Sequence, residues 1–127
     1  MTQEDKELLL KDLSSRLPYG IKIELTWWVM GEGTCINTTL EPDQIEQLLN
    51  DKDGNTEIKP YLRPMSSMTE KEKKELGRIS CEGNIEHKYG IFYKSQDYLN
   101  SIHVDYRGLI PKGLAIEVTK ENNPYKE

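Results

Sequence analysis

The chain has 127 residues, of which 35% are hydrophobic and 31% are charged, so it can build one domain with one modest core and has too few apolar residues for a second. Its net charge is −5, and no stretch clusters lysine and arginine as phosphate binding requires, which excludes nucleic acid from the expected partners. No run approaches the roughly 20 apolar residues of a membrane span, so we expect a soluble protein without membrane contact.

The first predicted element is a helix over residues 3 to 16. Thr2 is suited to cap it, because a threonine hydroxyl accepts a hydrogen bond from a free backbone N–H of the first helical turn. A stripe with helical spacing follows at Leu9, Leu10, Leu13 and Leu17. Pro18 disfavours helical geometry in the residue before it, so the helix is expected to end there.

Residues 21 to 30, IKIELTWWVM, alternate apolar and polar side chains with the period of a strand that buries one face. The alternation resumes at Thr34, so residues 21 to 40 predict a β-hairpin with its turn at residues 31 to 33. Trp28 lies on the polar face of the first strand. We expect a helix to cover it; the alternative is an exposed tryptophan of the kind that anchors protein interfaces.

Three more helices are predicted further along the chain. Pro42 suits the first position of a short one. Thr69 and Glu72 match the capping box, in which two side chains satisfy each other's free backbone N–H groups, and predict a helix over residues 70 to 81. Ser95 is a candidate N-cap for a last helix that runs through residue 103.

Together these elements predict an α+β fold: a small antiparallel sheet built on the hairpin, with three to four helices packed mainly on one face. Residues 114 to 118 alternate as a final strand that extends this sheet. Residues 56 to 62 and 89 to 93 are further strand candidates, the latter being equally compatible with the start of the last helix. A single domain is expected over residues 1 to 120, followed by a polar, frayed tail over 121 to 127.

Two sequence blocks carry a resemblance to a known family. They are KPYLRPMSSMTEKEKKE at residues 59 to 75, and DYLN followed by HVDYRGLIPKGLAIE between residues 97 and 117. With the LPYG turn at residues 17 to 20, they closely resemble a family of small proteins encoded in prophages and mobile elements of gut anaerobic bacteria. The resemblance covers most of the chain and is weakest between residues 31 and 57. It implies a bacterial cytoplasmic location and a phage-associated role, and it assigns no activity, ligand or functional residue.

Neither metal nor cofactor is expected from the pattern of potential ligands. Cys35 and Cys81 could form one disulfide, but free thiols in a reducing compartment are the favoured interpretation. His87 and His103 could join a cysteine around a metal ion, yet no pair has the spacing of a C-x-x-C or H-x-x-x-H site.

The one candidate catalytic cluster is His103, Asp105 and Arg107. A histidine beside a carboxylate can act as a general base, an arginine can hold an anionic transition state, and alternate residues of an extended segment project to the same side. The structural alternative is that Asp105 and Arg107 form an ion pair or bind backbone groups near Gly108. That alternative is favoured, because no nucleophile motif or phosphate-binding loop accompanies the three residues.

The candidate binding residues are Trp28, Tyr61 and Arg63. Arg63, held between two prolines, could meet a partner or a carboxylate of the acidic segment 41 to 57. The leading hypothesis is therefore a non-catalytic, phage-derived accessory protein that acts by protein–protein contacts, with an unidentified partner that could be a second copy of the chain. The alternative is a small hydrolase or nuclease-like enzyme that uses the His/Asp/Arg cluster.

Overall fold

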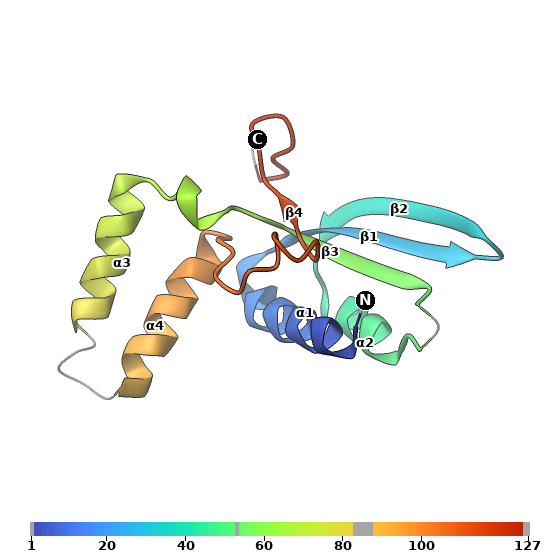
Figure 1. The fold of residues 1–127 in the computed structure, drawn as a ribbon, viewed down its shortest axis with the longest axis horizontal. Helices are drawn as coiled ribbons and strands as arrows, with labels where there is room; N and C mark the ends of the chain where they lie inside the picture. The colour runs from blue at the N-terminus through green and yellow to red at the C-terminus, as the bar shows by residue number, and fades with distance from the viewer. Residues whose placement is uncertain (1, 53, 83–87, 126–127) are drawn as a thin grey trace.

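A computed structural model describes the backbone of residues 2–52, 54–82 and 88–125, and the side chains of these residues outside 80–94. It confirms the α+β class. The elements are α1 (Gln3–Arg16), the single-turn 3-10 helix η1 (Leu17–Tyr19), β1 (Lys22–Val29), β2 (Glu32–Thr39), α2 (Pro42–Asn50), β3 (Thr56–Leu62), the 3-10 helix η2 (Met65–Ser67), α3 (Glu70–Glu82), α4 (Lys88–Ser101) and β4 (Ile116–Glu117), as Figure 1 shows.

The sheet has the strand order β2-β1-β3-β4, with β1 paired antiparallel to both β2 and β3. The expected final strand is shorter, and it lies parallel to β3, with Tyr61 opposite Ile116. The sheet is therefore mixed rather than wholly antiparallel. The cause is the long connection: α3 and α4 intervene between β3 and β4, and only a crossover of that length can bring a strand back in the same direction.

The hairpin turn lies earlier than the glycines at residues 31 to 33 predict. Met30 and Gly31 take positive φ angles of 53° and 83°, which is the geometry that two-residue hairpin turns require. Gly33 lies inside β2 and pairs with Trp28. The strands are therefore continuous from the turn to Lys22 and Thr39.

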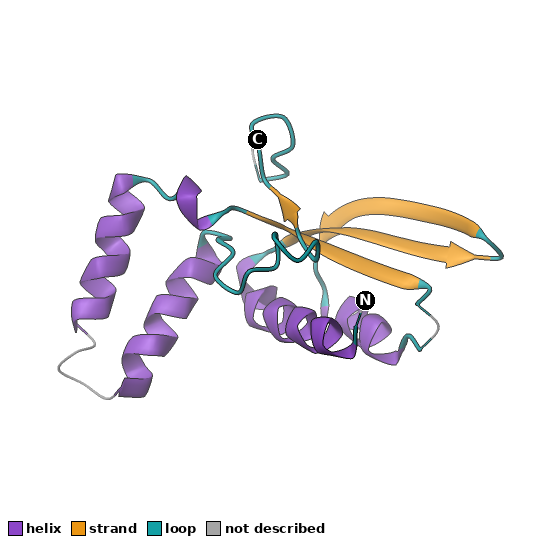
Figure 2. Ribbon diagram, in the orientation of Figure 1, coloured by secondary structure: helices purple, strands orange, loops and turns teal. Residues whose placement is uncertain are grey.

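The main core lies between the sheet and the helices α1 and α2, which cover one face of it (Figure 2). Ile21, Ile23 and Leu25 of the alternating segment are buried there, against Leu9 and Leu13 of α1. The apolar side chains of this face are not buried along the whole of β1, because Trp27 is half-buried and Val29 is 61% exposed. The hairpin extends past the helical layer formed by α1 and α2 (Figure 1).

Helices α3 and α4 form a second antiparallel unit beside the sheet (Figure 2). Residues 89 to 93 belong to α4, so the strand interpretation of that segment is wrong, and Ser95 lies within the helix instead of capping it. The capping box of α3 is confirmed, because the Glu72 backbone N–H donates to Thr69 Oγ1 and the Thr69 N–H donates to Glu72 Oε1. A small second core of Met68, Leu99 and Val104 joins this unit to the rest, so the expectation of a single core is wrong.

The C-terminal segment returns to the domain at Tyr125. Its ring stacks on His103 with the ring centroids 4.0 Å apart. Its hydroxyl accepts a hydrogen bond from the Lys22 backbone N–H at 3.0 Å and donates one to the Tyr61 carbonyl at 2.8 Å. A boundary at residue 120 therefore does not separate Tyr125 from the domain.

Candidate functional site

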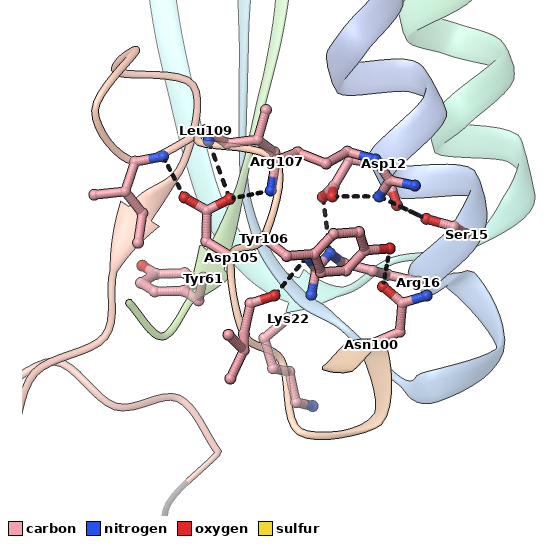
Figure 3. A network of polar contacts seen from close by, with 12 residues as sticks. Asp12, Ser15, Arg16, Lys22, Tyr61, Asn100, Asp105, Tyr106, Arg107 and Leu109 are labelled. Carbon is pink, nitrogen blue, oxygen red and sulfur yellow. Dashed lines mark hydrogen bonds and ion pairs between the residues drawn. The ribbon is translucent and has the colours of Figure 1, made fainter. Parts of the chain in front are cut away.

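A buried network of charges joins α1 to the loop that precedes β4 (Figure 3). The carboxylate of Asp12 accepts a hydrogen bond from Arg16 Nε at 2.9 Å and one from Arg107 Nη1 at 2.8 Å. The side chains of Asp12 and Arg16 are fully buried, and that of Arg107 is 11% exposed. One carboxylate thus faces two guanidinium groups out of water, where electrostatic attraction is screened least.

Arg16 also binds the loop that precedes β4. Its Nη2 donates to the Val104 carbonyl at 2.7 Å. The Tyr106 ring lies between the two arginines, with its centroid 5.1 Å from the Arg16 Cζ and 4.6 Å from the Arg107 Cζ. Its hydroxyl donates to Asn100 Oδ1 at 2.9 Å, at the end of α4. Cation–π contacts of this kind are strongest where the cation has lost its water. The network therefore fixes helix α1, helix α4 and the loop in one arrangement.

Asp105 binds backbone groups of its own loop. Its carboxylate accepts from the N–H groups of Arg107 at 3.3 Å, Leu109 at 3.0 Å and Ile110 at 2.9 Å. These contacts close the turn around Gly108, where φ is +77°. The carboxylate is thus used to satisfy amides that the turn leaves without partners, as the structural alternative proposed. Arg107 pairs with Asp12 and not with Asp105.

The contacts of His103 differ from those of Asp105 and Arg107. His103 has a positive φ of 61°, unusual for a residue with a side chain, and it stacks on Tyr125. Its Nδ1 atom is buried and has no hydrogen-bond partner among the described residues. Burial, with the positive charges of Arg16 and Arg63, lowers the pKa of His103 to about 4. The imidazole is therefore neutral at neutral pH and carries no charge for a helix dipole to stabilise.

The three members of the candidate catalytic cluster consequently serve three different contacts. A cleft of about 940 Å³ lies between α1, α2, β3 and residues 112 to 114, and none of the three lines it. The contacts support the structural interpretation of these residues. Among the side chains that the structure describes, no group of three or more His, Cys, Asp or Glu could hold a metal ion. The thiol of Cys35 is free and exposed, and the side chain of Cys81 lies outside the described part.

Arg63 is paired inside the chain, but not with the acidic segment 41 to 57. Its guanidinium binds Glu72 through two parallel hydrogen bonds of 2.8 and 2.7 Å, and also donates to the Ser67 carbonyl at 3.0 Å. Because those hydrogen bonds favour the ionised carboxylate, the pKa of Glu72 falls to about 2. Arg63 thus fastens the start of α3 to the end of β3.

Tyr61 is not an exposed binding residue. Its side chain is buried, its hydroxyl donates to Asn37 Oδ1 of β2 at 2.8 Å, and burial raises its pKa. Its role is to connect non-adjacent strands of the sheet. Of the three candidate binding residues, only Trp28 lies open to solvent.

Trp28 is 37% exposed, so the expectation that a helix covers it is wrong. A Cβ atom placed on Gly33 would lie 2.7 Å from Trp28 Nε1, which shows that the indole rests directly on the Gly33 backbone. Val29 and the fully exposed Met30 adjoin it at the tip, and Ile36 of β2 is 42% exposed. Ile36 pairs with Leu25, away from the turn, and shares a face with Val29, whereas Trp28 lies on the other face of the hairpin. The tip therefore presents Trp28 on one face and Val29 on the other.

Comparisons of the chain with protein-family models, with curated proteins and with solved structures found no match. No helix in the described ranges is long and apolar enough to cross a membrane.

The charged network was not predicted, although part of its signal is visible in the sequence. Asp12 and Arg16 are four residues apart and lie on the same helical face as Leu9 and Leu13, which is the face that packs on the sheet. Charged residues inside a buried stripe must be paired. Their partner Arg107 lies 95 residues from Asp12 and has no local signal.

Proposed function

We propose that this protein is non-catalytic and acts by protein–protein contacts made through the tip of the β1–β2 hairpin. We call the exposed side chains of Trp28, Val29 and Met30, at the turn end of the hairpin, the hairpin tip. The observation that supports the proposal is the exposure of these large apolar groups on an element that extends past the helical layer (Figure 1). Clustered exposed apolar side chains are typical of interaction sites, and tryptophan is enriched among the residues that contribute most binding energy.

The seating of Trp28 adds to this. Because the indole rests on Gly33, it is held in one orientation while more than a third of it remains accessible. An aromatic group that is already ordered loses little conformational entropy when a partner covers it. Glycine at position 33 is needed for this seat, since any Cβ there would displace the ring.

The biological setting of the proposal comes from the resemblance of the KPYLRPMSSMT and DYRGLIPKGLAIE blocks to prophage and mobile-element proteins. On that basis we propose a phage-derived accessory protein that works in the bacterial cytoplasm. The contacts of Asp105 and Arg107 support the non-catalytic part, because Asp105 is buried against backbone amides and Arg107 is paired with Asp12, whereas a catalytic acid or anion-binding arginine must reach its substrate.

The test is affinity capture of the tagged protein from cells in which a parent prophage has been induced, followed by quantitative mass spectrometry. Wild-type protein is compared with Met30→Lys, which places a charge at the centre of the hairpin tip. Met65→Lys is the matched control, because Met65 is 45% exposed and lies outside the hairpin.

We expect one partner in stoichiometric amount with wild-type protein and with Met65→Lys, reduced at least about tenfold with Met30→Lys, since burying an unpaired charge removes more than a kcal/mol of binding energy. Capture that is equal for all three proteins would exclude the hairpin tip as the contact surface. Absence of any retained protein would contradict the proposed function as a whole.

A further inference from the structure

Strand β2 is an edge of the sheet, and its outer backbone groups are open. The N–H of Leu40 donates to the Ile21 carbonyl, which places the even-numbered residues of this strand at the positions that bond β1. Gly33, Cys35, Asn37 and Thr39 therefore turn their N–H and C=O groups away from β1. No hydrogen bond reaches these backbone groups from the described residues, and residues 32 to 37 are all exposed.

The edge lacks the features by which proteins prevent strand pairing. Proline, lysine, bulges and covering segments are the usual protections. Residues 32 to 39, EGTCINTT, contain no proline or lysine, and their register with β1 is one to one with no bulge. Helix α2 packs against α1 and β3, which leaves the β2 edge uncovered. At the opposite edge, β4 has only two residues and offers little to pair with.

We propose that β2 pairs antiparallel with β2 of a second copy of this chain, about a two-fold axis at Ile36, so that the two sheets become continuous. This register brings all four outward-facing residues into hydrogen-bonding positions, with Gly33 opposite Thr39 of the second copy and Cys35 opposite its Asn37. Registers centred on residue 35 or 37 bring fewer of these four outward-facing residues into hydrogen-bonding positions. The contact is isologous, so it closes at two copies.

The side chains agree with this register. Ile36 lies at a non-hydrogen-bonded position, where opposed residues approach most closely, and it would meet its own copy across the axis. Ile36 is 42% exposed in the single chain, so the pairing would bury an apolar group that now faces water. Thr34 falls opposite Thr38, a pair that is favourable in antiparallel sheets.

Charge does not oppose the pairing. Glu32 is the one charged side chain of β2, and in this register it falls opposite Leu40 of the second copy. The two Glu32 residues are eight positions apart along the joined strands, about 27 Å at the usual rise per residue, which is beyond the screening length of roughly 8 Å in physiological salt.

The backbone edge and the hairpin tip are different surfaces, so the self-association can fail while the proposed function holds, and the reverse. A single strand pair buries less than the about 1,200 Å² of a stable complex, so we expect a weak dimer that forms reversibly with concentration. The measurement is sedimentation equilibrium over about 10 μM to 1 mM protein, the range in which a weak dimer should change from mostly monomeric to mostly dimeric.

Wild-type protein should rise in mass from 14.7 kDa toward twice that value. Ile36→Lys places two like charges opposite each other at the axis and should weaken the dimer at least about tenfold. Val29→Lys is the matched control: it adds the same charge to the same face of the hairpin, on the strand that does not form the edge, and it should dimerise like wild-type protein. Circular dichroism establishes that each variant is folded.

A charge exchange tests the axis itself. Ile36→Glu should also be monomeric alone, whereas an equimolar mixture of Ile36→Lys and Ile36→Glu should form a mixed dimer, because the opposed charges are then complementary. A wild-type chain that stays monomeric throughout the concentration range would overturn the proposal. So would a dimer that resists Ile36→Lys, or a Lys and Glu mixture that stays monomeric.

Discussion

The buried charge network makes a quantitative prediction about stability, because Asp12 is the shared partner of two arginines. Asp12→Asn keeps the shape of the side chain but removes its charge, and the new amide N–H group faces guanidinium donors that it cannot bond. Removing one member of a buried ion pair costs about 3–5 kcal/mol, since the remaining charge stays buried without compensation. Asp12 and Arg16 are both fully buried, so we expect a loss within that range.

The assay is urea unfolding followed by circular dichroism, with the free energy of unfolding obtained by linear extrapolation. Domains of this size have a free energy of unfolding of about 5–15 kcal/mol, so a loss of 3–5 kcal/mol moves the midpoint strongly or abolishes folding. Glu7→Gln is the control, because Glu7 is an exposed acid on the same helix. A loss below about 1 kcal/mol for Asp12→Asn, or a loss equal to that of the control, would refute the reasoning.

A second variant distinguishes uncompensated charge from lost shape. Replacing the whole network with apolar side chains, as Asp12→Leu, Arg16→Met and Arg107→Met together, leaves no buried charge behind. Buried ion pairs replaced by well-packed apolar groups of similar volume are often neutral or stabilising. We therefore expect the triple variant to be more stable than Asp12→Asn alone. A triple variant less stable than Asp12→Asn would show that the arginines contribute mainly through packing and backbone contacts.

Three further changes test the contacts that fix the ends of the chain and of α3. Tyr125→Phe removes the hydroxyl that bridges β1 and β3, and should lower the free energy of unfolding by about 1–3 kcal/mol in the same assay. Arg63 lowers the pKa of Glu72 from 4.5 to about 2 in the folded protein. The stabilisation that the Arg63–Glu72 contact provides is therefore complete above pH 4.5 and is lost as the pH falls toward 2. Glu72→Gln should remove this dependence of the free energy of unfolding on pH between 4.5 and 2. The pKa of His103 is lowered from 6.5 to about 4 in the folded protein. As the pH falls, His103 is therefore protonated in the unfolded chain before it is protonated in the folded one, and the free energy of unfolding should decline between pH 6.5 and pH 4. His103→Asn, which tolerates the positive φ, should remove that decline, and an unchanged pH profile would contradict the burial of the imidazole.

Local signals in the sequence were sufficient for the α+β class and for most of the elements, but not for the bounds of α4 or the position of the hairpin turn. The Thr2 cap, the Thr69–Glu72 capping box and the strand period of residues 21 to 30 are each confirmed. These patterns succeed because each depends on residues within one or two turns of each other. The direction of β4 could not be predicted in that way, since it depends on where the α3–α4 unit returns the chain.

Burial was harder to predict than secondary structure. The alternation from Ile21 to Val29 gives two faces, but it contains no information on how far the helices reach beneath the sheet. Val29 is open for that reason, whereas Trp28 is open because α1 and α2 cover the opposite face of the sheet, the one that buries Ile23 and Leu25. An alternating run of residues predicts a strand, but whether helices cover that strand depends on the size and position of the helical layer.

The candidate catalytic cluster failed to assemble for a reason that spacing cannot reveal. Residues 103, 105 and 107 would project to one side only if the backbone were extended throughout, but His103 has a positive φ that turns the chain at the first of them. A glycine there would have indicated a turn, and a histidine does not. Asp105 and Arg107 both precede Gly108; the Asp105 carboxylate bonds the amides of the turn, and the Arg107 side chain reaches Asp12 of α1. In this His-x-Asp-x-Arg pattern Asp105 therefore bonds amides of its own loop, Arg107 pairs with Asp12, and His103 stacks on Tyr125.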